Sequence, residues 1–297
     1  MEETTMNKVR GEIGLLFVSI IWGSGFIASA IGLDYLSSYE TLAGRFLVAS
    51  VLLAAVNHKK LFWLRWRTIR NGMILGGFLY GAFILQTVGL EHTTPSKNAF
   101  LTAVNVAVVP FIGFLFHKTA LDRKDVLRAS LSMVGVALIS LNWTGVLNIG
   151  DVLSFLCAFV FALHIFYTGE FMEDEDPLSL TMVQMITAFI LAVFFMALRG
   201  DTLLMKDTRG YLAILYLGVF STTIAFLMMS ICQKYTKSSR AAVIMSTESL
   251  FAMVFSILIL SENVTPRMIL GALVIFTAII LPQSAEVEAP SLEEEVV

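Results

Sequence analysis

The sequence predicts an all-α, polytopic membrane protein with ten transmembrane helices, arranged as two inverted repeats of five helices. Three observations predict this. The chain has 297 residues, of which 57% are hydrophobic and only 14% are charged, whereas about 25% of an average soluble domain is charged. Apolar runs of about 20 residues, the length needed to cross a bilayer, recur along the chain. The two halves of the chain also align with each other at a nearly constant offset.

The apolar runs define ten predicted spans, joined by short connections. We place them at residues 13–32, 39–56, 72–90, 98–117, 126–142, 150–168, 178–198, 210–231, 241–260 and 266–282. The first run has no convincing cleavage site after it, so we expect it to be a retained span and not a removed signal peptide. The acidic, proline-containing tail at 284–297 is predicted to be disordered.

The internal repeat comes from shifting the chain against itself. At a shift of 142 residues, 94–111 lies on 236–253 and 128–141 lies on 270–283; at a shift of 139, 20–26 lies on 159–165. The predicted units are therefore 1–145 and 146–283. Because each unit holds five spans, an odd number, the second must enter the membrane upside down, as in many secondary transporters.

The distribution of Lys and Arg predicts the orientation. If the N-terminus is cytoplasmic, the inner loops hold 14 of these residues and the outer loops hold 5. The positive-inside rule then places both termini in the cytoplasm, for a multi-pass protein of the cytoplasmic membrane. The second half of the chain contributes little to this signal.

Several short motifs resemble the drug/metabolite transporter superfamily, and in particular its ten-span, EamA-type members. They are WGSGF (22–26), GRF (44–46), the run from Gly89 to Thr102, the run 241–265 and GALVIF (271–276). The resemblance covers residues 13–282 and implies a transporter of small metabolites, often an exporter of amino acids, with its site enclosed by spans 1–4 and 6–9. The family commonly has proline after the acid of the ninth span, where this chain has Ser249.

Other functional classes find little support in the sequence. No basic stripe suggests nucleic acid, and no Walker A motif suggests direct use of ATP. No local motif indicates a metal or a cofactor, and Cys157 and Cys232 fall inside apolar segments. A membrane-embedded, lipid-modifying enzyme is the alternative from another class, with Glu40, Glu91 and His92 as its modest candidates. A passive channel is a further alternative.

Two residues place charge inside predicted spans, where an ionised side chain costs about 2.5–3.5 kcal/mol. Arg45 is either a counter-ion for a substrate carboxylate or Glu248, or a side chain that snorkels to the interface or pairs with Glu40. Glu248 is either a proton carrier, an anchor paired with a cation, or a hydrogen-bonded contact between helices. The hydroxyl groups of Ser246, Thr247 and Ser249 are its expected neighbours.

The fourth span carries a polar stripe, because Asn98, Thr102 and Asn105 are spaced i, i+4, i+7. The shift of 142 puts Arg240, Ile244 and Thr247 on the matching stripe. The two stripes either enclose a shared cavity or form helix–helix hydrogen bonds. Pro110, in the same span, is expected to kink it and serves either as a gate or as a static bend.

The remaining candidates are aromatic or imidazole side chains inside spans. His164 and Tyr167 lie in the sixth span, Trp22 in the first and Tyr80 in the third. His164 either titrates or donates to a backbone carbonyl, and Trp22 either stacks on a solute or fills the bundle.

Together, these observations predict a secondary transporter for a small amphipathic metabolite, with possible proton coupling through Glu248 and no enzymatic activity.

Overall fold

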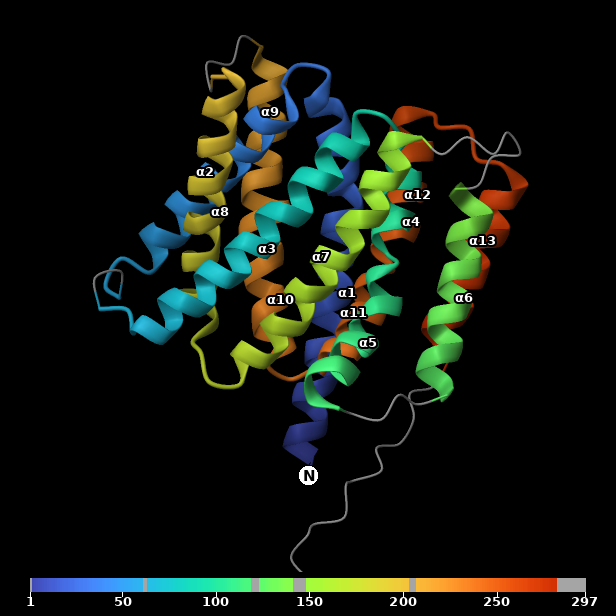
Figure 1. Cartoon of the computed structure of the whole chain (residues 1–297), viewed down its shortest axis with the longest axis horizontal. Helices are drawn as coiled ribbons and strands as arrows, with labels where there is room; N and C mark the ends of the chain where they lie inside the picture. Colours follow the sequence, from blue (N-terminus) through green and yellow to red (C-terminus); the bar gives the residue numbers. More distant parts are fainter. Residues whose placement is uncertain (1, 61–62, 119–122, 141–147, 203–206, 282–297) are drawn as a thin grey trace, which may run out of the picture.

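The structure is a computed structural model that describes residues 2–60, 63–118, 123–140, 148–202 and 207–281. Within these residues all regular structure is helical, which confirms the all-α prediction (Figure 1). The tail at 284–297 lies outside the described residues. The helices of the first half are α1 (Glu2–Leu33), α2 (Ser38–Val56), α3 (Trp66–Leu90), α4 (Pro95–Thr102), α5 (Asn105–His117) and α6 (Arg123–Ser140).

The second half repeats this order with one difference. A π-helical segment, η1, interrupts the helix that corresponds to α3. The elements are α7 (Ile149–Met172), α8 (Pro177–Arg199), α9 (Thr208–Tyr216), η1 (Leu217–Ile224), α10 (Ala225–Gln233), α11 (Ser238–Met245), α12 (Glu248–Leu260) and α13 (Pro266–Ile280).

Eight helical segments of the described chain are long and apolar enough to cross a membrane: Val9–Leu33, Ser38–Val56, Trp66–Leu90, Pro95–Phe116, Ile149–Met172, Pro177–Arg199, Thr208–Gln233 and Ser238–Leu260. Helices α6 and α13 carry shorter apolar stretches, Val126–Gly135 and Pro266–Ala278. Large apolar side chains are exposed on the outer helix faces; Leu115 and Leu258, for example, are 72% and 73% exposed. Such faces suit lipid, so the chain is a multi-pass membrane protein.

Two membrane segments are interrupted in the middle, at equivalent positions. Helix α4 stops at Thr102 and α5 starts at Asn105, while α11 stops at Met245 and α12 starts at Glu248. All four bounds repeat at an offset of 143 residues. The left-handed residues that end α5 and α12, Lys118 (φ 52°) and Ser261 (φ 54°), repeat at the same offset.

The first two helices of each half repeat at a different offset. Ser37 and Asp176 are the N-cap residues of α2 and α8, and each side chain accepts a hydrogen bond from the backbone of the first turn. They are 139 residues apart, as are Leu33 and Met172, which end α1 and α7. The sequence-based shift of 139 for this region is therefore the shift that the helix bounds show.

The π-helical segment explains why the offset becomes 143 and not 142 in the fourth helix. The N-caps of α3 and α9, Arg65 and Asp207, are 142 residues apart, but the last residues, Leu90 and Gln233, are 143 apart. A π-helical turn accommodates an extra residue in a continuous helix. The extra residue in η1 therefore moves every later alignment by one position, so Glu248 corresponds to Asn105 and Thr247 does not.

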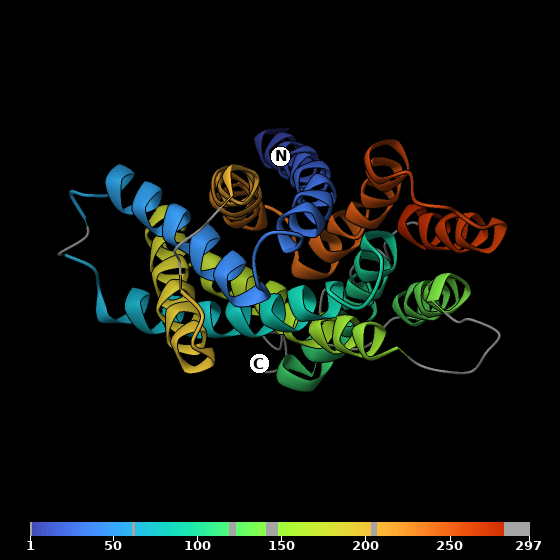
Figure 2. The ribbon, with the colours of Figure 1, turned by 90° about the horizontal axis from the view of Figure 1, so that it is seen from above.

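Helices α6 and α13 pack on each other at one edge of the molecule, and α2 crosses α8 toward the opposite edge (Figure 2). Small residues allow these close contacts, as expected between helices in lipid. A Cβ on Gly135 would lie 2.8 Å from the carbonyl oxygen of Gly271. The contacts of α1 with α10 and α12 are matched by those of α7 with α3 and α5.

Candidate functional site

An internal cavity lies among the interrupted helices. About 40 Å³ of it is open to a water-sized molecule, and one water needs about 10–15 Å³ on this measure, so in this conformation it has room for a few waters and for no larger solute. Helices α6 and α13 do not line it. The lining consists of Trp22, Gly25, Phe26, Ser29, Arg45, Phe83, Gln86, Thr87, Leu90, Thr102, Asn105, Phe161, His164, Ile165, Ser221, Phe226, Met229, Met245 and Glu248.

Glu248 is the one carboxylate among the residues that line this cavity, and it is only 6% exposed. It is the first residue of α12, so its charge would lie at the positive end of that helix. The ion pairs of the described chain do not include Glu248 with Arg45 or with any other cation. Its counterpart Asn105 begins α5 and lines the same cavity.

The hydroxyl groups expected beside Glu248 do not bind it. Ser246, Thr247 and Ser249 donate to the backbone carbonyl oxygens of Val243, Ile244 and Ser246, respectively, at 2.7–2.8 Å. The carbonyl groups of Ile244 and Ser246 also accept from the backbone N–H groups of Thr247 and Ser249, so backbone turns and hydroxyl groups together satisfy the polar groups at the interruption. The helix is interrupted here with Ser249 in place of the proline that the family commonly has.

Arg45 is turned into the bundle and is 2% exposed. Its Nε donates to Oγ1 of Thr222 at 2.9 Å, its Nη2 donates to Oγ of Ser221 at 3.3 Å, and its guanidinium lies 4.1 Å from the ring centre of Phe83. The alternatives of snorkelling and of pairing with Glu40 are therefore wrong. The Glu40 carboxylate instead accepts from the backbone N–H of Ser37, in a capping box.

The π-helical segment supplies both acceptors of Arg45, and it also holds Trp22. The indole Nε1 donates to the carbonyl oxygen of Ser221 at 2.9 Å, and the ring packs against Phe226 with 4.9 Å between centroids. Hydrogen bonds within a π-helix span five residues, which is the spacing of Thr223 Oγ1 and the carbonyl of Gly218. Ser221 lines the cavity, and Thr222 beside it lies within hydrogen-bond distance of Arg45.

His164 lies in the cavity wall beside Phe226, with 5.7 Å between ring centroids. Its Nε2 is 3.0 Å from Oε1 of Gln184 on α8, so its partner is a side chain and not the expected backbone carbonyl. Gln184 corresponds to Arg45 at the offset of 139. Both side chains are buried, so this level of the helix faces protein in both halves.

The residues of the polar stripe in the fourth span have different surroundings. Thr102 and Asn105 line the cavity, and Thr102 also accepts from Nε2 of Gln86 at 3.1 Å. Asn98 does not line it. Its Nδ2 donates to Oγ of Ser154 at 2.7 Å, so it makes the helix–helix hydrogen bond that was the alternative.

Three further candidates lie outside the cavity lining. Tyr80 stacks on Phe195, and Tyr167 stacks on Phe78, with 5.4 and 5.7 Å between ring centroids. Pro110 lies inside α5, which continues through it as a helix. The interruption of this segment is at 103–104, several residues before Pro110, so the proline does not cause it.

Sequence reasoning did not single out Phe83, Phe226 or Ser221 for the site. Phe83 and Phe226 are equivalent at the offset of 143, and both line the cavity. Ser221 belongs to the run Ser-Thr-Thr within an otherwise apolar span. That polar run, and the paired phenylalanines, were the signals available in the sequence.

The cavity approaches one end of the bundle, which we call the Leu90 end; it contains Leu33, Leu90 and Pro95. Ser29, Thr87 and Leu90 line the cavity toward this end, and a second, polar depression there also includes Leu90. The equivalent residues of the other half do not line it: Thr168, Ser230 and Gln233 are buried. Gln233 donates to the carbonyl of Ile165 at 3.0 Å.

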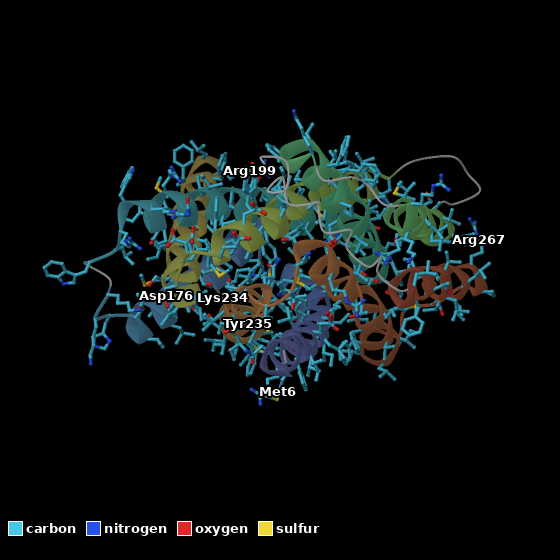
Figure 3. All side chains as sticks on the ribbon, turned by 90° about the horizontal axis from the view of Figure 1, so that it is seen from below. Met6, Asp176, Arg199, Lys234, Tyr235 and Arg267 are labelled. Carbon is cyan, nitrogen blue, oxygen red and sulfur yellow. The ribbon has the colours of Figure 1, made fainter. Side chains whose placement is uncertain are left out.

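The opposite end, which we call the Glu12 end, contains Glu12, Gln233 and Arg240. Figure 3 views the molecule from this side and labels Met6, Asp176, Lys234 and Tyr235 there. Polar and charged side chains mark both ends of the bundle, as expected where helices leave a membrane. Because Thr168, Ser230 and Gln233 do not line the cavity, it does not extend toward the Glu12 end as it does toward the Leu90 end, and we call the Glu12 end closed.

The sequence matches one known family twice, the EamA-like transporter family, over residues 9–141 and 148–282. An uncharacterized transporter of Archaeoglobus fulgidus is 33% identical over 93% of this chain and 86% of the relative. A second from that organism is 25% identical over 84% and 89%, and the uncharacterized transporter YyaM of Bacillus subtilis is 27% identical over 61% and 63%.

A solved crystal structure has the same arrangement of helices. It superposes with a TM-score of 0.73 over 91% of this chain and 95% of the solved chain, at 12% sequence identity. This likeness shows a shared fold and nothing about the solute.

Proposed function

Because the chain belongs to the EamA-like transporter family, we propose that it is a secondary transporter that exports a small metabolite, such as an amino acid or a derivative. The observation that carries the proposal is the position of the cavity. It lies between two interrupted helices, and Asn105 and Glu248 face it from equivalent points of the two halves. Discontinuous helices at the meeting of two repeats form the solute sites of many secondary transporters.

The proposed membrane topology has ten spans. Helices α6 and α13 are the fifth and tenth spans, in addition to the eight longer segments. Five spans in each half make the two halves inverted copies. Their exchangeable contacts and repeated helix bounds support this proposal. The excess of Lys and Arg in the inner loops supports a cytoplasmic location of both termini, so the Leu90 end faces outward.

The chemistry of the cavity favours a small solute with both polar and apolar parts. Arg45 supplies a cationic fork for a carboxylate, Glu248 supplies an acidic group, and Trp22 and the phenylalanines supply apolar walls. A polyanion such as a nucleotide sugar would need several deep Lys or Arg residues, and the lining has only Arg45. Because the cavity has room for only a few waters in this conformation, solute binding requires it to widen.

Proton coupling through Glu248 is part of the proposal. An ionised carboxylate inside a membrane is costly without a cation, and no cation pairs with Glu248 among the described residues. Taking up a proton in one conformation and releasing it in the other would couple proton movement to solute movement.

The experiment that tests the function has two steps. Purified protein is first screened by thermal shift against a panel of amino acids and related metabolites, because a solute that binds only the folded state raises its melting temperature. Solutes that stabilise the protein are then tested for flux in proteoliposomes, with and without a pH gradient. The absence of any stabilising or transported small metabolite, together with tight binding of nucleotide sugars, would reject the proposed solute class.

A further inference from the structure

The two ends of the bundle contain equivalent contacts between the first helix of one half and the third helix of the other. Gly11 of α1 packs on the carbonyl oxygen of Cys232, and Gly150 of α7 packs on the carbonyl oxygen of Gly89. Gly11 and Gly150 are related by the offset of 139, and Gly89 and Cys232 by the offset of 143. The Glu12 end and the Leu90 end are therefore built alike.

An acidic residue follows each of these glycines, but the two acids have different partners. Glu12 forms an ion pair with Arg240, in which Nε and Nη2 lie 3.2 and 3.3 Å from its two carboxylate oxygens. Asp151 instead accepts a hydrogen bond from Oγ1 of Thr93 at 2.6 Å.

Each end also contains the partner that the other end uses. Thr236, equivalent to Thr93, is buried beside Gly11, and its hydroxyl has no hydrogen-bond partner among the described residues. Lys97, equivalent to Arg240, is in the first turn of α4, and the described ion pairs do not include it with Asp151. Each end thus contains an acid, a threonine and a cation at equivalent positions. The acid binds the cation at the Glu12 end and the threonine at the Leu90 end.

The partner of each acid correlates with the end of the bundle that the cavity approaches. The cavity approaches the Leu90 end, where Asp151 binds threonine, and it is closed toward the Glu12 end, where Glu12 binds its cation. The cation lies in the first turn of α11, which continues into the interrupted segment that carries Glu248. An ion pair between α1 and α11 therefore holds that segment against the first helix at the closed end.

We propose that Glu12–Arg240 and Asp151–Lys97 are a pair of alternating gates, in which the carboxylate binds the cation at the end away from the cavity and the threonine at the end that the cavity approaches. The inference rests on the proposed transport function. In the opposite conformation Asp151 pairs with Lys97, Glu12 accepts from Thr236, and the cavity approaches the Glu12 end. Glu12 and Arg240 keep 26% and 29% of their side chains exposed. Such pairs contribute modestly, so they bias the equilibrium between conformations without locking it.

The test uses two single-cysteine reporters at equivalent positions, in a background with Cys157→Ala and Cys232→Ala. Ser29→Cys reports on the Leu90 end, and Thr168→Cys, 139 residues later, reports on the Glu12 end. The rate of reaction with a hydrophilic maleimide is measured on the purified full-length protein in nanodiscs. Both faces are accessible there, so the readout depends neither on the membrane orientation nor on the solute.

Removing the cation at either end should shift the two reporters in opposite directions. Arg240→Gln weakens the present closed end, so Thr168→Cys should react about two- to fivefold faster and Ser29→Cys more slowly. Lys97→Gln weakens the opposite conformation, so Thr168→Cys should react more slowly. The charge exchange Glu12→Arg with Arg240→Glu should restore the rates of the parent protein.

A purely structural role would give another pattern. If Arg240→Gln and Lys97→Gln changed the reporters in the same direction, or left both rates unchanged, the gates would be ruled out. Variants are compared only where melting curves show a folded protein, and the charge exchange keeps the test decisive if Arg240→Gln does not fold. Solute flux is a separate measurement, so failure of the gates is distinguishable from failure of the transport proposal.

Discussion

Asn105 and Glu248 begin the second parts of two interrupted helices, 143 residues apart, and both side chains line one cavity. The two halves thus present an amide and a carboxylic acid at equivalent points. The fold is nearly symmetric at this level, but its chemistry is not, because only one half can carry a proton there. This asymmetry makes Glu248 the most informative position in the chain.

We predict that Glu248→Gln abolishes the response of solute flux to a pH gradient in proteoliposomes, while flux down a solute gradient persists. Gln keeps the size and polarity of the side chain but cannot exchange a proton. Glu40→Gln is the matched control, since Gln can replace Glu in the capping box with Ser37. Flux of Glu248→Gln that still follows the pH gradient would exclude this residue from coupling.

The equivalence of the two positions allows a rescue variant. Moving the acid across the cavity, by Asn105→Glu with Glu248→Asn, should restore part of the pH response, because the carboxylate again faces the same space. If the double variant remains unresponsive although it folds and binds solute, then the surroundings of α12 and not the shared cavity determine coupling.

Arg45 should be sensitive even to Lys. Its guanidinium donates to Thr222 and Ser221 and lies over Phe83, and an ammonium group cannot reproduce this planar, bidentate geometry. We expect Arg45→Lys to weaken solute binding about tenfold or more, measured by thermal shift across a solute titration. Arg199→Lys is the control, because Arg199 stacks on Tyr39 outside the cavity. Equal losses in both variants would contradict a specific role for Arg45.

Two adjacent glycines of α3 should respond in opposite ways to Ala. A Cβ on Gly76 would lie 2.6 Å from the carbonyl oxygen of Gln184, so α3 and α8 must separate, at a cost of about 1–3 kcal/mol. A Cβ on Gly77 has no atom within 4 Å, and Gly77→Ala should be neutral or stabilising by up to about 1 kcal/mol. Melting temperatures in detergent measure both; a similar fall in both would disprove the packing of α3 on α8.

Asp176, the N-cap of α8, should make stability depend on pH. Burial opposes its ionisation, but hydrogen bonds from the side chain and N–H of Ser179, and the ammonium of Lys60, outweigh burial and lower the pKa of the carboxyl below 3.8. Its contribution, about 1 kcal/mol for an N-cap, is therefore complete above about pH 5 and is lost progressively as the pH falls through the lowered pKa.

The melting temperature of Asp176→Ala should accordingly lie below that of the parent protein at pH 7, and the two should converge well below pH 4. Asp174→Ala is the control, since the ion pair of Asp174 with Arg67 is exposed. A difference that grew on acidification would mean that the carboxyl is stabilised in its neutral form.

The sequence was sufficient for the elements that depend on apolar length and on internal similarity. The helical class and the positions of the long spans follow from apolar runs, and the shift of 139 for the first helices follows from aligning the chain with itself. The cavity residues Trp22, Arg45, Thr102, Asn105, His164 and Glu248 were identified as rare polar or aromatic groups within spans.

The remaining features depend on geometry that residue identity does not show. One extra residue absorbed by η1 changes the offset from 142 to 143, and hydropathy cannot locate an insertion inside an apolar helix. Asn98 and Asn105 share a stripe, but the interruption at 103–104 separates their surroundings, so only Asn105 lines the cavity. Arg45 finds acceptors from another helix, 176 and 177 residues away in the chain.

The most direct test of the central claim is counterflow in proteoliposomes preloaded with a solute that stabilises the purified protein. Transport by alternating access predicts that labelled solute enters transiently against its gradient and that uptake saturates with solute concentration. Uptake that rises linearly with concentration, shows no counterflow, and is accompanied by single-channel currents would contradict the account and identify a passive pore.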